Sequence, residues 1–142
     1  GNDVLGWGNF GHDELTGGSG ADRFYSGPWA WTNQQVGTVL ISDFETGVDK
    51  LDLSRFDADE RTVPGIIKGK NTPGNEAFTV VDQTNEVTPG HLTISTGIDE
   101  LGRTITIVRG YTDTDPGADI EVILLGIGAN GQPILTPQDI LL

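Results

Sequence analysis

The chain opens on a glycine- and aspartate-rich segment that repeats about every nine residues. Residues 17–25, GGSGADRFY, match the nonapeptide G-G-x-G-x-D-x-U-x at every defined position, where U is a large apolar residue. Residues 8–16, GNFGHDELT, match with Asn9 in place of the second glycine, and residues 1–5 supply the latter part of a third copy. A short fixed period of this kind predicts stacked repeats, each of which buries its apolar face against its neighbours.

The repeat predicts where its aspartates lie. In each copy the first six residues form a turn and the last three a short strand whose apolar residue points inward. Two such copies make one coil, so turns two copies apart stack on the same edge at about 4.8 Å. Asp3 and Asp22 therefore share one edge, and Asp13 lies on the other. The chain begins inside a copy, so we expect the parent protein to continue upstream.

Stacked turns of this composition indicate a calcium site. Carboxylate and carbonyl oxygens would face each other across the gap, and Ca²⁺ takes six or more oxygen ligands at about 2.3–2.6 Å. Glycine permits the bend, and without an ion the carboxylates repel. We expect one to three Ca²⁺ ions, the best formed between the turns of Asp3 and Asp22. The candidate ligand-bearing residues are Gly1, Asp3, Gly8, Asn9, Gly11, Asp13, Gly17, Gly18, Gly20 and Asp22, with Asp49 and Asp52 as further candidates whose alternative role is turn capping.

Composition supports a cation-binding protein. The 142 residues include 21 acidic and 8 basic ones, for a formal net charge of −13. Such a surface repels nucleic acid and anionic membranes. Cysteine is absent, so disulfides cannot clamp the fold, and a metal is the usual substitute outside the cell. No apolar stretch is long enough to predict a membrane-spanning helix, and no charged-then-apolar leader is visible.

The pattern changes after residue 25. Trp29 and Trp31 take the places of the fourth-position glycine and the sixth-position aspartate of a further copy. We expect a roll over residues 1–27 and a β-rich cap over 28–142, together one continuous domain. The predicted fold class is all-β, a short parallel β-roll continued by a β-sandwich-like cap. Period-two alternation predicts strands at 38–42, 50–53, 77–81, 91–95, 103–108, 119–125 and 139–142, and helical turns within 53–62 and at 136–139.

The repeats resemble the RTX repeats of bacterial proteins exported by the type I route. Residues 39–58, VLISDFETGVDKLDLSRFDA, resemble the segment that follows the β-roll in the serralysin metalloproteases. Residues 117–126 and 138–142 resemble the closing strand and acidic-apolar terminus of that family. The resemblance implies a secreted, calcium-binding module with export information at its C-terminus and a catalytic domain upstream. Epimerases, glycanases and lipases carry similar modules, so the activity of the parent stays open.

Catalysis by these residues is not expected. The zinc motif H-E-x-x-H is absent, His12 and His91 have no partner at ligand spacing, and no cysteine or G-x-S-x-G serine is present. The predicted function is a module that folds on extracellular Ca²⁺ and supports type I secretion and the stability of an upstream catalytic domain.

Two segments leave alternatives open. Trp29 and Trp31 point to one side of an extended segment, where they either stack on a polysaccharide or plug the end of the roll. The first option would make the chain a carbohydrate-binding or adhesion module, and docking of an inhibitor or of the upstream domain is a third option. Residues 139–142 form either a final edge strand or a tail that the export machinery recognises, and both roles are compatible at different times.

Overall fold

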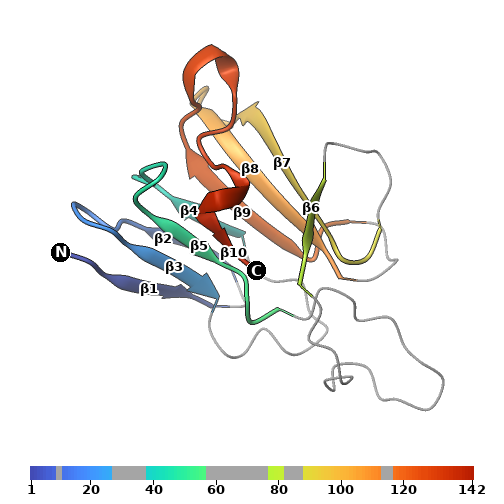
Figure 1. The fold of residues 1–142 in the computed structure, drawn as a ribbon. Coiled ribbons are helices and arrows are strands. Elements are labelled where there is room, and N and C mark those ends of the chain that lie inside the picture. The colour runs from blue at the N-terminus through green and yellow to red at the C-terminus, as the bar shows by residue number, and fades with distance from the viewer. Residues whose placement is uncertain (9–10, 27–37, 57–76, 82–87, 113–116) are drawn as a thin grey trace.

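The computed structural model describes residues 1–8, 11–26, 38–56, 77–81, 88–112 and 117–142. The described strands form two sheets that share one apolar core (Figure 1). The four-stranded sheet has the order β1 (Val4–Trp7), β3 (Arg23–Ser26), β5 (Lys50–Asp52), β10 (Ile140–Leu141). The six-stranded sheet has the order β2 (His12–Leu15), β4 (Thr38–Ile41), β9 (Ile120–Leu125), β8 (Thr104–Tyr111), β7 (His91–Ile98), β6 (Thr79–Val81). The predicted all-β class is confirmed.

Strands β1 to β5 wind as a parallel coil that alternates between the two sheets. Leu5 pairs with Phe24 across β1 and β3, and His12 pairs with Thr38 across β2 and β4. The coil expected from the repeats continues past residue 27, because β4 and β5 stack in parallel on β2 and β3 although their turns lack the nonapeptide pattern. Strand pairing needs only backbone groups and a matched apolar face, which β4 and β5 retain. The division at residues 27 and 28 stays a prediction.

The C-terminal half adds strands to both sheets. In the six-stranded sheet β9 joins β4 in parallel, and β8 and β7 continue antiparallel from it. In the four-stranded sheet β10 lies parallel to β5 and forms the edge, as expected for residues 139–142. Two 3₁₀ helices, η1 (Ala129–Gly131) and η2 (Pro137–Asp139), lie between β9 and β10, and η2 confirms the turn expected at 136–139.

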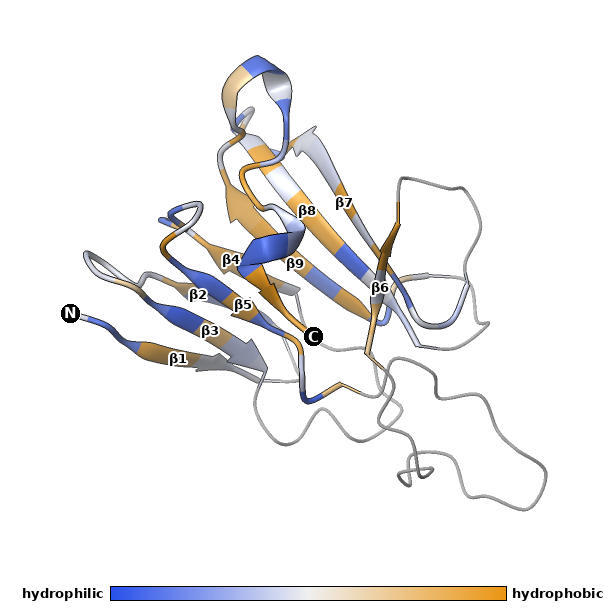
Figure 2. Cartoon of the chain, in the orientation of Figure 1, coloured by the Kyte–Doolittle hydropathy of each residue, from blue (hydrophilic) through white to orange (hydrophobic). Residues whose placement is uncertain are grey.

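Alternation along the strands builds the core. In β9 the residues Ile120, Val122 and Leu124 are buried, while the residues between them are partly exposed, and Figure 2 shows apolar residues recurring along β8 and β9. Phe24 of β3 is fully buried, and its ring centroid lies 6.1 Å from that of Phe44. Burying one such side chain contributes about 1.5–3 kcal/mol. This core fixes the entry points of β1, β3 and β5, where the aspartates lie.

Candidate metal centre

The turns before β1 and β3 lie side by side, as the repeat predicts. The Arg23 amide donates to the Asp3 carbonyl at 2.9 Å, and the Ala21 amide donates to the Asn2 side-chain oxygen at 3.0 Å. The Gly1 nitrogen donates to the Ser19 carbonyl at 2.7 Å. Residues 1–3 and 17–22 therefore form two stacked turns at one edge of the four-stranded sheet.

The Asp22 carboxylate lies between these turns and is only partly satisfied. Its side chain is buried, with 1% of the residue exposed, and Oδ1 accepts the Asp3 amide at 2.7 Å. Oδ2 is buried and has no hydrogen-bond partner, the one such side-chain oxygen among the residues that the structure describes. Leaving a carboxylate oxygen buried and unpaired is costly, and a hard cation at Oδ2 would remove that cost. The donor chemistry of this position therefore fits Ca²⁺.

Side chains alone do not complete such a site. Within the described ranges no three His, Cys, Asp or Glu side chains are grouped so as to hold a metal ion. A calcium ion at Asp22 would therefore draw most of its oxygens from turn carbonyls, which the glycine-rich repeat exposes. Gly11, Gly18 and Gly20 have positive φ angles of 88°, 83° and 130°, which allow the sharp bends of these turns.

Two glycines lie where no side chain fits. A Cβ on Gly20 would lie 2.2 Å from the Gly1 carbonyl oxygen of the neighbouring turn, so a side chain there would separate the two stacked turns. A Cβ on Gly17 would lie 2.4 Å from Oδ2 of Asp22, so a side chain there would displace Asp22 within its own turn.

We expect Gly20→Ala to destabilise the folded chain by about 2 kcal/mol or more, because a φ of 130° is nearly exclusive to glycine and the new methyl group meets backbone. Gly102→Ala is the control, since Gly102 also has a positive φ but an added Cβ there meets nothing within 4 Å. Urea unfolding in calcium measures both variants. Equal losses of stability in the two variants would show that the close approach of the two turns at Gly20 contributes nothing to stability.

Asp49 extends the row of aspartates but is fully hydrogen-bonded. It precedes β5 in register with Asp22 and Asp3, since Lys50 pairs with Arg23 and Arg23 with Val4. Its Oδ1 accepts the Asp22 amide and its Oδ2 the Glu45 amide, both at 2.8 Å. This geometry favours turn capping, and ion ligation by Asp49 stays a prediction.

Asp52 lies at the other end of β5 and is also satisfied on both oxygens. Oδ2 accepts the Arg23 Nε at 2.7 Å, and Oδ1 accepts the Ser54 amide at 3.0 Å. Burial alone would raise the pKa of Asp52, but the hydrogen bonds from Ser54 and Arg23 outweigh it, so this pKa lies below its ordinary value. Ligation by Asp52 likewise stays a prediction.

The opposite edge of the roll holds Asp13. Its Oδ2 accepts the Gly8 amide at 2.9 Å, a bond within its own turn. On the Asp22 edge, Asp43, which follows β4, accepts the amides of Gly17 and Gly18 at 2.9 and 2.7 Å and so joins the turn after β4 to the turn 17–22. Carboxylates thus fix turns through backbone amides at both edges. Asn9, Trp29 and Trp31 lie outside the described residues, so their predicted roles, glycan contact included, stay predictions.

Asp139 is a structural carboxylate that the sequence interpretation missed. It is 1% exposed, and its Oδ1 accepts the Gly47 amide at 3.0 Å and lies 3.4 Å from the Lys50 Nζ. Its Oδ2 accepts the Thr136 amide at 3.0 Å and the Thr136 hydroxyl at 2.7 Å, which forms a capping box around η2. The sequence T-x-x-D could have revealed this cap.

The lowered pKa values predict acid sensitivity. Burial opposes ionisation of Asp139, but bonds from Thr136, Gly47 and Lys50 leave its pKa below the ordinary value, as at Asp52. A carboxyl whose pKa falls on folding stabilises the fold above its unfolded pKa, near 3.9, and that contribution is lost as pH falls through the folded value. We therefore expect stability to decrease below about pH 4. Thermal melts between pH 3 and 6 measure it, and a melting temperature that rises on acidification would contradict the assignment.

Parallel coils entered by stacked glycine-aspartate turns define a β-roll module. The family model described as Peptidase M10 serralysin C terminal matches residues 2–115, and the chain belongs to this family of calcium-binding, RTX-type C-terminal modules of secreted proteins. The family is the non-catalytic part of metalloproteases, which implies a larger protein. A search of curated proteins finds no match. Among the described helices, none has the length and apolar character needed to cross a bilayer.

Proposed function

We propose that this chain is a calcium-dependent folding module that becomes ordered outside the cell and supports secretion and stability of an upstream catalytic domain. The unpaired, buried Oδ2 of Asp22 is the observation that carries the proposal. Asp22, Asp3 and carbonyls of the turns 1–3 and 17–22 would hold the ion, which supplies charge neutralisation between the turns. Export depends on an unfolded chain, so a fold that requires the ion matches the proposed route.

The calcium affinity typical of extracellular modules fits a chain whose folding is switched by calcium. Extracellular calcium modules bind with Kd of about 10⁻⁴–10⁻³ M, so the ion is bound at millimolar and released at cytosolic concentrations. A tenfold excess over Kd adds about 1.4 kcal/mol per site. Because the net stability of a domain is only a small difference between large opposing terms, one such site switches folding where the ion-free chain is within about 1 kcal/mol of the balance between folded and unfolded states.

The terminal residues would act in export before folding. In the folded chain Ile140 pairs with Leu51, and the preceding Asp139 is buried in hydrogen bonds. A receptor that recognises residues 139–142 would therefore meet them in the unfolded chain only. Residues 139–142 would thus be recognised by the type I machinery in the unfolded chain, and Ile140–Leu141 would form β10 after folding.

Far-UV circular dichroism during a calcium titration tests the proposal. We expect a spectrum with little β signal in chelator and a cooperative gain of β signal at calcium concentrations of about 10⁻⁴–10⁻³ M. Mg²⁺ at equal concentration serves as the control, because its tighter octahedral demand fits turn carbonyls poorly. A spectrum that is equally β-rich in chelator and in calcium would remove the folding switch.

A further inference from the structure

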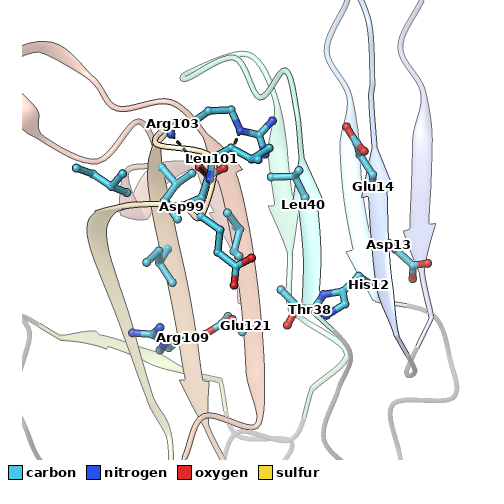
Figure 3. Close-up of a pocket in the computed structure, with 15 residues that line it drawn as sticks. His12, Asp13, Glu14, Thr38, Leu40, Asp99, Leu101, Arg103, Arg109 and Glu121 are labelled. Carbon is cyan, nitrogen blue, oxygen red and sulfur yellow. Dashed lines mark hydrogen bonds and ion pairs between the residues drawn. The ribbon is translucent and has the colours of Figure 1, made fainter.

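The outward face of the six-stranded sheet is hollowed into an open groove of about 620 Å³ (Figure 3). Its floor is apolar: Leu40, Ile123 and Ile107 lie in one row, because Ile123 pairs with Leu40 on one side and with Ile107 on the other. These residues alternate with core residues of the same strands, so they face away from the core. The groove is therefore separate from the aspartate row of the four-stranded sheet.

The turn between β7 and β8 forms an apolar wall of this groove. Ile98 and Leu101 are 73% and 77% exposed, although both are large and apolar. The turn is well held, because Asp99 Oδ1 accepts the amides of Leu101 and Arg103 at 2.9 and 2.8 Å. Exposed apolar side chains on a fixed turn, next to an apolar floor, are typical of a binding surface.

The rim of the groove is negative. Both of its guanidinium groups are already paired: Arg103 Nε lies 2.6 Å from Asp99, and Arg109 Nε lies 2.9 Å from Glu121. The exposed Glu14 on β2 has no ion-pair partner among the described residues, and neither does Glu100. The lining carboxylates are Asp13, Glu14, Asp99, Glu100 and Glu121. An apolar floor is thus bordered by an excess of negative charge.

The negative charge of the groove rim and of the whole chain limits which partners can bind there. Nucleic acid, anionic lipid and anionic polysaccharide are repelled, and so is a second copy of a chain with a net charge of −13. An apolar floor with few free polar groups also suits a neutral sugar poorly. We propose that the groove is a docking site for a peptide segment of a partner protein that presents apolar side chains flanked by Lys or Arg. A groove of this volume accepts only a few side chains.

Titration of the whole 142-residue chain with a fluorescent synthetic peptide of Leu and Lys, in calcium and at physiological salt, tests the proposal. We expect Ile123→Ser to weaken binding about tenfold, since it removes the centre of the floor, and Glu14→Gln about threefold, since it removes a rim charge. The matched controls are Val4→Ser, at a valine 68% exposed on β1, and Glu45→Gln, at an exposed glutamate beyond β4. Each should change the affinity less than about twofold.

Three results would overturn the proposal. Equal weakening by the floor and control variants would show unspecific attraction to an acidic protein. Equal affinity for a peptide of Leu and Glu would exclude a role for the rim charge. Self-association of the chain that Ile123→Ser abolishes would assign the groove to a second copy. If circular dichroism shows that Ile123→Ser does not fold, Leu101→Ser replaces it, because Leu101 is exposed on a turn and its loss leaves the sheet unchanged.

Discussion

Asp22→Asn is expected to raise the calcium concentration needed for half-maximal folding at least about tenfold. The site loses its buried anionic ligand, and calcium affinity depends on the charge of the ligand set. Asparagine has the same shape, so its oxygen can still accept the Asp3 amide, which Asp22 Oδ1 accepts at 2.7 Å. The substitution therefore isolates the charge and the second oxygen, and a calcium titration followed by far-UV circular dichroism measures the shift.

In chelator the same variant should behave in the opposite way. Wild-type Asp22 buries a carboxylate oxygen that has no partner, and removing that charge relieves an uncompensated cost. In chelator, where little β signal is expected, Asp22→Asn should retain at least as much β signal as the wild type, so that the wild type is the more folded of the two only when calcium is present. Glu45→Gln, an exposed carboxylate, is the control for a loss of one negative charge. A variant with less β signal than the wild type in chelator and an unchanged calcium midpoint would mean that Asp22 is only a turn cap.

The strands could be predicted because their signal is local. Period-two alternation places apolar residues on one face whatever the partner strand is, and the strands expected at 38–42, 50–53, 77–81 and 119–125 are observed. The hairpin strands were predicted too short: 91–95 is observed as His91–Ile98, and 103–108 as Thr104–Tyr111. Pairing extends them, since Ile98 is opposite Thr104 at the hairpin end although the alternation of side chains is weak there.

Only part of the candidate metal centre could be predicted from the sequence, because only part of it is built from the repeat. Asp3 and Asp22 are joined by the repeat period, so their stacking follows from the spacing alone. Asp49 and Asp139 enter the same sheet from turns with other sequences, and they are brought there by the pairing of β3 with β5 and of β5 with β10. No short-range pattern encodes parallel pairing between segments so far apart. The same holds for the groove, whose floor comes from β4, β8 and β9.

Asp139→Ala is expected to lower the free energy of unfolding by about 2–4 kcal/mol in calcium. Alanine removes the carboxylate that accepts the amides of Gly47 and Thr136, and a hydrogen bond to a charged group contributes about 1.5–3 kcal/mol. The Lys50 ammonium also loses its carboxylate at 3.4 Å, although that partly exposed pair contributes little. Urea unfolding followed by circular dichroism measures the change.

The destabilisation by Asp139→Ala should also reach the calcium turns, because hydrogen bonds to successive carboxylates link Asp139 to Asp22. Asp139 holds the turn of Gly47, and the Asp49 that follows accepts the amide of Asp22 at 2.8 Å. We therefore expect Asp139→Ala to raise the calcium midpoint as well, with Gln138→Ala, at the exposed neighbour, leaving both quantities nearly unchanged. An unfolding free energy within about 0.5 kcal/mol of the wild type would show that the last coil is held by β10 pairing alone. A lowered stability with an unchanged calcium midpoint would show that the two edges of the four-stranded sheet fold independently.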